Sequence, residues 1–107
     1  MSRLPTGILV SALLRRANDS GGSGMVLAKG DAQAGGVLLV LAGRDTPDRV
    51  IERGIGPDGK TALIESHTGE GTTDYWRRRR RSDPDLWVIE LDSPLAERFA
   101  AETLLDN

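Results

Sequence analysis

Hydrophobic residues along the chain fall in short runs, and clusters of glycine and polar residues separate these runs. The first run, Ile8–Leu14, continues into residues that favour a helix and stops at the cluster Asn18–Gly22. This pattern predicts a first helix, for which Thr6 or Ser11 is the expected N-terminal cap. The face expected to be buried comprises Ile8, Leu9, Ala12 and Leu13.

Two pairs of runs in the middle of the chain predict β-hairpins. Met25–Lys29 and the almost wholly apolar Val37–Leu41 flank a glycine-containing loop, which predicts a hairpin whose second strand is buried on both faces. Arg49–Ile55 and Thr61–His67 flank the tetrapeptide Gly56-Pro57-Asp58-Gly59. Proline fixes the first central position, aspartate suits the second, and glycine accepts the left-handed conformation, so this turn is the best-defined feature of the chain.

The C-terminal third predicts a helix, a strand and a further helix. Asp74–Ser82 forms the helix, capped by Thr72 or Thr73 and ended by Asp83-Pro84, because a residue before proline avoids the helical region. Leu86–Leu91 is rich in strand-forming residues and should bury Trp87. Ser93-Pro94 opens the last helix. Its apolar stripe comprises Leu95, Ala96, Phe99 and Ala100.

The predicted order of elements is α-β-β-β-β-α-β-α. Two hairpins make the sheet of about five strands mainly antiparallel, so the predicted class is α+β with three helices. The chain has 107 residues and shows neither an internal repeat nor a linker, which favours one domain over residues 1–107.

Composition removes several classes of function. The chain has no cysteine, which excludes disulfides, thiol nucleophiles, iron–sulfur clusters and zinc ribbons. Its apolar runs are far shorter than the ~20 residues that cross a bilayer, and its N-terminus lacks the pattern of a signal peptide. We therefore expect a cytoplasmic protein without membrane contact.

Candidate catalytic chemistry is sparse. His67 is the only histidine; Ser66 should point to the opposite face of the strand, whereas Glu65 should share the face of His67. The string Gly54-Ile55-Gly56-Pro57-Asp58-Gly59 matches G-x-G-x-x-G, but a strand follows it where a dinucleotide site needs a helix. The sequence thus predicts no catalytic residue, no metal and no cofactor, and it favours a non-enzymatic protein.

Five consecutive arginines in the predicted second helix are the anomaly of the sequence. Steps of about 100° per residue send these side chains around the helix axis, so they cannot all lie on one face. The other nine basic residues stand against 16 acidic ones, so the positive charge is concentrated here. The predicted anion- or partner-binding residues are Arg77, Arg78, Arg79, Arg80 and Arg81, together with Arg15 and Arg16.

Three interpretations of this cluster remain open. In the first interpretation, the arginines form a solvated helix surface paired with acidic residues of the same fold. In the second, they contact an acidic protein surface or a second copy of the chain, since forked guanidinium donors suit carboxylates. In the third interpretation they bind nucleic-acid phosphates, with Tyr75 and Trp76 available for stacking. The acidic pI of about 5.3 weakens the third. We favour an interaction module that contacts an acidic partner.

Parts of the sequence resemble a known family. The segments Val10–Arg16, Gly30–Gly35 and Arg81–Glu90, the last containing Asp-Pro-Asp-Leu-Trp, are similar to the DUF1491 family of small alphaproteobacterial proteins. The resemblance spans nearly the whole chain and supports one cytoplasmic domain. The family has no assigned activity, cofactor or catalytic residues, so the resemblance implies no mechanism.

Overall fold

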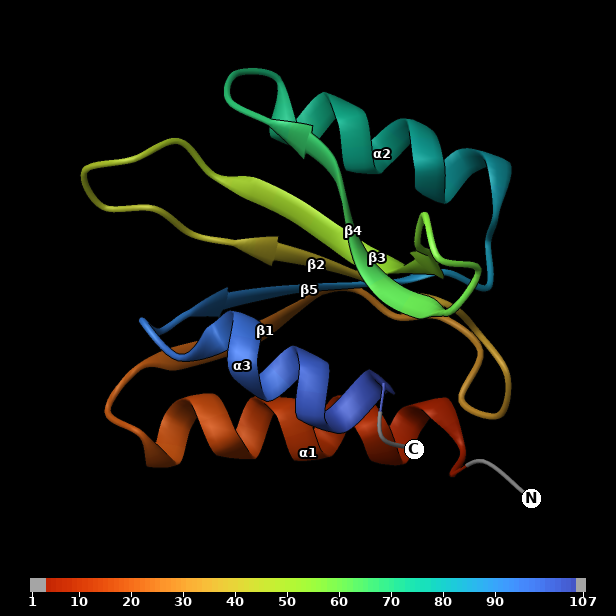
Figure 1. Cartoon of the computed structure of the whole chain (residues 1–107), viewed down its shortest axis with the longest axis horizontal. Helices are drawn as coiled ribbons and strands as arrows, with labels where there is room; N and C mark the ends of the chain where they lie inside the picture. Colours follow the sequence, from red (N-terminus) through yellow and green to blue (C-terminus); the bar gives the residue numbers. More distant parts are fainter. Residues whose placement is uncertain (1–3, 106–107) are drawn as a thin grey trace.

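The computed structural model describes residues 4–105 and places a five-stranded sheet between two layers of helix (Figure 1). The class and the order of elements confirm the α+β prediction. The elements are α1 (Thr6–Asp19), β1 (Ser23–Ala28), β2 (Val37–Leu41), β3 (Arg49–Ile55), β4 (Thr61–Thr68), α2 (Thr72–Ser82), β5 (Trp87–Asp92) and α3 (Ala96–Ala100), which continues as a π-helical turn, η1 (Ala101–Leu105).

The sheet has the strand order β1-β5-β2-β3-β4. The predicted β3–β4 hairpin is confirmed, with the strands antiparallel from Arg49 opposite Thr68 to Ile55 opposite Thr61. Its turn has Gly59 at a φ of 80°, in the left-handed region, and the Gly56 N–H donates to the Lys60 carbonyl at 2.7 Å. The G-x-G-x-x-G string is therefore a hairpin turn, as its context predicts.

The predicted hairpin between β1 and β2 is wrong, because β5 lies between them. β5 pairs antiparallel with β1 and parallel with β2. The connection after β1 passes around the start of β5 and is held there by hydrogen bonds: the Asp31 N–H donates to the Asp85 carbonyl at 3.0 Å, and the Trp87 N–H to the Gly36 carbonyl at 2.9 Å. β2 is nevertheless the central strand, and its buried residues on both faces confirm the other half of the prediction.

Two hydrophobic clusters cover the two faces of the sheet. α1 and α3 lie on one face and enclose the larger cluster, whereas α2 lies alone on the other face (Figure 1). Trp87 is buried, as predicted. On α1 the buried side comprises Leu9, Val10, Leu13 and Ala17. Ile8 is 53% exposed, contrary to prediction, because it lies nearly half a turn around the helix from the centre of the buried stripe.

The predicted helix caps are mostly not formed. The Thr6 hydroxyl donates to the Gly35 carbonyl at 2.7 Å, and the Thr72 hydroxyl to the Gly69 carbonyl at 2.9 Å, so both tie a helix start to a neighbouring loop instead of capping it. Ser11 lies inside α1 and donates to Gly7. Ser93 does accept the Leu95 N–H at 3.1 Å and helps to start the last helix. Between residues 4 and 105 there is no helix whose length and apolarity would suffice to span a bilayer.

Candidate functional site

The arginine-rich helix α2 is held on the sheet by its aromatic residues. Tyr75 and Trp76 pack against the smaller hydrophobic cluster, which includes Val40 and Val88. The Tyr75 ring also stacks on the His67 ring, with centroids 4.9 Å apart. Both aromatic side chains therefore serve the attachment of the helix, and neither stands free as a stacking platform.

Arg79 is the charged anchor of α2. Its two terminal nitrogens donate to the two carboxylate oxygens of Glu52 on β3, at 2.6 and 2.7 Å, and the first nitrogen also donates to the Tyr75 hydroxyl at 2.8 Å. This paired geometry is the strong form of an arginine–carboxylate contact. The hydrogen bond from Arg79 lowers the pKa of Glu52, against the opposing effect of burial. Arg79 is thus part of the fold.

Arg80 is a second contact between α2 and the sheet. Its Nη2 donates to the main-chain carbonyl of Lys29, just beyond the end of β1, at 2.7 Å. The side chain is half-buried, as is that of Arg79. Two of the five consecutive arginines are therefore committed to contacts within the chain.

Arg77, Arg78 and Arg81, here called the arginine face, are exposed on the outward side of α2. Their positions fall within about 100° around the helix axis, opposite to the side that carries Arg79. No carboxylate of residues 4–105 forms an ion pair with any of the three. Arg77 rests over the Trp76 ring, 5.7 Å from its centroid, which supports its side chain while leaving it at the surface. The exposed Asp74 is the one acidic neighbour on this side of the helix.

Arg15 and Arg16 are not brought together with the arginine face. Both belong to α1, on the opposite side of the sheet from α2 (Figure 1). Arg16 lies over the Phe99 ring at 4.5 Å and forms an ion pair with Glu102, whose pKa is lowered chiefly by this hydrogen bond. Arg15 is exposed but isolated from α2. The predicted set therefore divides into two separate surfaces.

A β-bulge in β4 separates the residues considered for acid–base chemistry. The register shifts so that His67 lies opposite Val50, whereas Glu65 lies opposite Ile51, and these two neighbours belong to different clusters. The expectation that Glu65 and His67 share a face is therefore wrong. The His67 Nε2 is 2.8 Å from the Glu70 carbonyl. A carboxylate–imidazole pair is not formed.

The Glu65 carboxylate is held by two other partners. It accepts hydrogen bonds from the Thr68 hydroxyl and the Arg49 Nε, both at 2.5 Å, and these lower its pKa. Arg49 also reaches Glu97 on α3 at 2.8 Å. This network joins the β3–β4 hairpin to the last helix, and it gives Glu65 a structural role.

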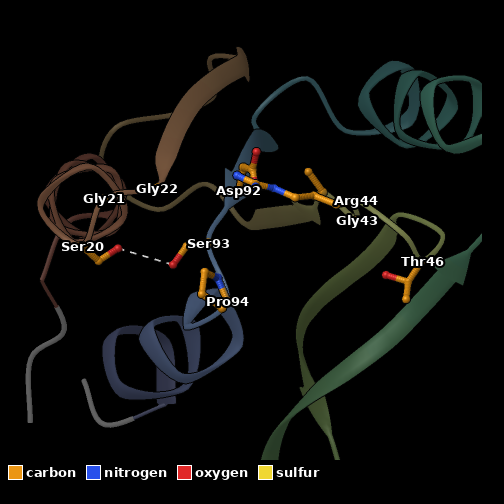
Figure 2. Close-up of a pocket in the computed structure, with 10 residues that line it drawn as sticks. Ser20, Gly21, Gly22, Gly43, Arg44, Thr46, Asp92, Ser93 and Pro94 are labelled. Atoms are coloured by element: carbon orange, nitrogen blue, oxygen red, sulfur yellow. Dashed lines mark hydrogen bonds and ion pairs between the residues drawn. The ribbon is translucent and has the colours of Figure 1, made fainter.

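A pocket of about 530 Å³ lies where β2 and β5 end and α1 gives way to β1 (Figure 2). No sequence pattern predicted this pocket beyond the loop-forming glycines. Its one charged pair, Arg44 and Asp92, lies 3.9 Å apart, so the pocket has little net charge. Figure 2 shows the Ser20 and Ser93 hydroxyls pointing toward each other, 3.4 Å apart.

The glycines of this pocket are explained by the packing of its loops. A Cβ added at Gly22 would lie 2.3 Å from the Asp92 carbonyl oxygen, and one at Gly43 would lie 2.0 Å from the Thr46 carbonyl oxygen. These close main-chain approaches require glycine whether or not a ligand binds. Across the described part of the chain, no cluster of three or more histidine and acidic residues is arranged to hold a metal ion.

Comparison with known proteins gives a family and its fold. A family model described as "Protein of unknown function (DUF1491)" matches residues 4–101. A crystal structure of a DUF1491 family protein from Caulobacter crescentus CB15 is 36% identical and covers 91% of this chain and 94% of that one, with a TM-score of 0.77. An NMR structure of a DUF1491 family protein from the same organism gives 34% identity, 92% and 94% coverage and a TM-score of 0.74.

A more distant relative has the same fold. The solution structure of a protein from A. tumefaciens is 27% identical, covers 86% of this chain and 87% of that one, and has a TM-score of 0.69. A search of curated proteins finds no match. None of these comparisons assigns a ligand or a reaction.

Proposed function

Because the chain belongs to the DUF1491 family, for which no activity is established, we propose its function from its own surface: a non-enzymatic binding module that contacts an acidic protein through the arginine face. The observation that carries the proposal is that the five arginines of α2 fall into two groups, one bound within the chain and one exposed. Arg79 and Arg80 bind inside the chain, while Arg77, Arg78 and Arg81 remain exposed without a carboxylate partner among residues 4–105. We place this binding in the cytoplasm, following the expectation from the sequence.

Charge segregation supports an anionic partner. Outside the arginine run the chain has nine basic and 16 acidic residues, so its remaining surface repels an acidic partner and directs it toward α2. Guanidinium groups offer planar paired donors that match carboxylates. The helix backbone holds the three groups close together, and Trp76 supports Arg77 from below. These features favour one acidic patch as the complementary surface.

Nucleic acid fits this surface less well than an acidic protein does. Base stacking would need free aromatic faces, but Tyr75 and Trp76 pack on the sheet, and His67 covers one side of Tyr75. A phosphate backbone would also extend beyond three arginines onto a surface with excess acidic residues. The experiment must therefore distinguish binding of nucleic-acid phosphates from binding of an acidic protein.

The experiment measures binding by fluorescence anisotropy at several salt concentrations. The probes are a labelled glutamate homopeptide, a single-stranded RNA and a duplex DNA of matched length. We expect the glutamate peptide to bind best at low salt. The triple variant Arg77→Ser/Arg78→Ser/Arg81→Ser should bind it about ten-fold more weakly, since three exposed charge pairs at about 0.5 kcal/mol each give a factor of this size.

A matched triple variant controls for net charge. Arg15→Ser/Arg44→Ser/Arg98→Ser removes three exposed arginines from other surfaces and should keep binding close to the wild-type value. Equal losses in both triples would show that binding follows overall charge and would refute the proposed surface. If RNA or DNA binds more tightly than the peptide and depends on the same three arginines, nucleic-acid binding replaces the proposal.

A further inference from the structure

The strand β1 forms one edge of the sheet and leaves its outer side open. Within residues 4–105, β1 has β5 as its single neighbour. Its six residues, Ser23–Ala28, carry no charge, and two of its apolar side chains are exposed, Met25 at 54% and Val26 at 39%. Proteins usually guard such an edge with charged residues or proline, because an open edge is a template for another strand. The opposite edge, β4, does carry a charged residue, Glu65.

The hydrogen bonds of β5 show which groups of β1 point outward. The Trp87 N–H and the Leu91 carbonyl bind residues flanking β2, so odd-numbered residues of β5 face β2 and even-numbered ones face β1. Glu90 and Asp92 therefore exchange hydrogen bonds with Met25 and Ser23, their partners in register. Gly24 and Val26 alternate with these residues, so their N–H and C=O groups point away from the sheet.

We propose that β1 pairs antiparallel with β1 of a second copy, about a two-fold axis that passes through Met25. Gly24 of each copy then lies opposite Val26 of the other, and each such pair exchanges two main-chain hydrogen bonds. The Val26 side chain then lies opposite Gly24 of the other copy, next to the Leu14 and Leu91 side chains that cover this glycine. The two Met25 side chains meet on the face that carries α2. The sheet becomes continuous through both copies.

Neighbouring side chains support this register. A Cβ placed on Gly24 would lie 3.0 Å from Leu14 Cδ2 and 3.1 Å from Leu91 Cδ2, so Val26 of the second copy would rest beside apolar groups. Leu14 is itself only half-buried in one copy. The contact therefore covers apolar surface from α1 as well as from β1.

Charged residues near the two ends of β1 are complementary between the two copies when the strands pair in this way. Asp92 lies beside Ser23 at the start of β1, whereas Lys29 follows its last residue and Arg80 reaches the Lys29 carbonyl; Glu90 lies beside Met25, close to the axis. Antiparallel pairing places the basic end of one copy beside the acidic end of the other. A parallel arrangement would place like charges together. This distribution selects a second copy in antiparallel orientation as the occupant of the edge.

Cysteine cross-linking tests the register directly, because the chain contains no cysteine of its own. Met25 is the one residue that pairs with its own copy, at a non-hydrogen-bonded position where Cα atoms lie about 4.5 Å apart, within the range of a disulfide. We expect Met25→Cys to form a disulfide-linked dimer under mild oxidation. Val26→Cys should cross-link far less, since Val26 faces Gly24. Equal cross-linking of both variants would overturn the register.

Sedimentation equilibrium of reduced, full-length protein tests the edge itself. Val26→Pro removes an outward N–H and leaves the β1–β5 ladder intact, so the fold should persist while self-association weakens at least about ten-fold. Val26→Thr keeps the N–H and the branched shape and should associate like the wild type. A wild-type chain that stays monomeric at millimolar concentration, or a Val26→Pro variant that associates unchanged, would overturn the proposal. The arginine face takes no part in this contact, so either proposal can fail alone.

Discussion

The ion pair between Arg79 and Glu52 should be the main polar attachment of α2 to the sheet. Replacing Arg79 with alanine removes two paired hydrogen bonds to Glu52 and one to the Tyr75 hydroxyl. It also leaves the Glu52 carboxylate, whose side chain is only 22% exposed, without its cation. The neighbouring Arg78→Ala changes the same formal charge on the same helix but removes no ion pair of the described residues.

The size of the effect follows from the degree of burial. Exposed ion pairs contribute about 0.2–1 kcal/mol, whereas breaking a buried pair costs about 3–5 kcal/mol. The Arg79 side chain is 36% exposed and Glu52 less so, which places this pair between the two limits. We expect Arg79→Ala to lower the free energy of unfolding by about 2 kcal/mol and Arg78→Ala by less than about 0.5 kcal/mol.

Urea denaturation followed by tryptophan fluorescence measures both variants, since Trp76 lies on α2 and Trp87 in the core. For a domain of this size, 2 kcal/mol shifts the midpoint by about 1–2 M urea. A double-mutant cycle with Glu52→Gln should give a coupling energy of at least about 1 kcal/mol. Equal losses for Arg78→Ala and Arg79→Ala would refute the assignment of Arg79 as an anchor.

The pH dependence has a definite sign. Arg79 lowers the pKa of Glu52 in the folded chain, so the unfolded chain binds a proton at Glu52 more readily than the folded chain does. The stabilisation is therefore complete above the ordinary glutamate pKa of about 4.3 and is lost as pH falls through the lowered value. The difference in stability between wild type and Glu52→Gln should be constant from neutral pH to mildly acidic pH and shrink at lower pH.

Three further substitutions test the loop that carries the chain around β5. Trp87→Phe removes the indole N–H that donates to the Asp31 carbonyl at 2.8 Å and should cost about 1–2 kcal/mol, measured by urea denaturation with circular dichroism. Gly30→Ala would place a Cβ 2.2 Å from the Asp85 carbonyl oxygen and should cost at least about 2 kcal/mol, whereas Gly36→Ala, with 3.4 Å to the Leu86 side chain, should cost clearly less. If Gly36→Ala proves the more harmful of the two, the close approach at Gly30 is not what fixes this loop.

Local chemistry explains what the sequence predicted correctly. The β3–β4 hairpin depends on Gly56-Pro57-Asp58-Gly59, where every preference acts within the turn, and the Asp58 side chain adds a hydrogen bond to the Lys60 N–H at 3.0 Å. The β1–β2 pairing failed for the opposite reason. Its outcome depends on β5, which arrives some fifty residues later along the chain, and no preference within residues 23–41 encodes that strand.

The arginine cluster shows that contacts between distant residues also limited the prediction of the candidate site. The helical step alone predicted that five consecutive arginines could not share one face. Which of them bind inside the chain depends on Glu52 on β3 and on Lys29 just after β1, both distant from α2 in sequence. The separation of Arg15 and Arg16 from α2 likewise follows from the placement of helices on opposite faces of the sheet (Figure 1).

The composition of α2 explains why two arginines serve the fold at all. The helix contains no aliphatic residue that could pack on the sheet, and none of its residues is fully buried. Tyr75 and Trp76 supply its apolar contact, which leaves Arg79 and Arg80 to fix its orientation through Glu52 and Lys29. A helix attached in this way is held less firmly than α1, which buries four aliphatic side chains and Thr6. α2 should therefore exchange its amide hydrogens faster than α1, and a partner bound to the arginine face should slow that exchange.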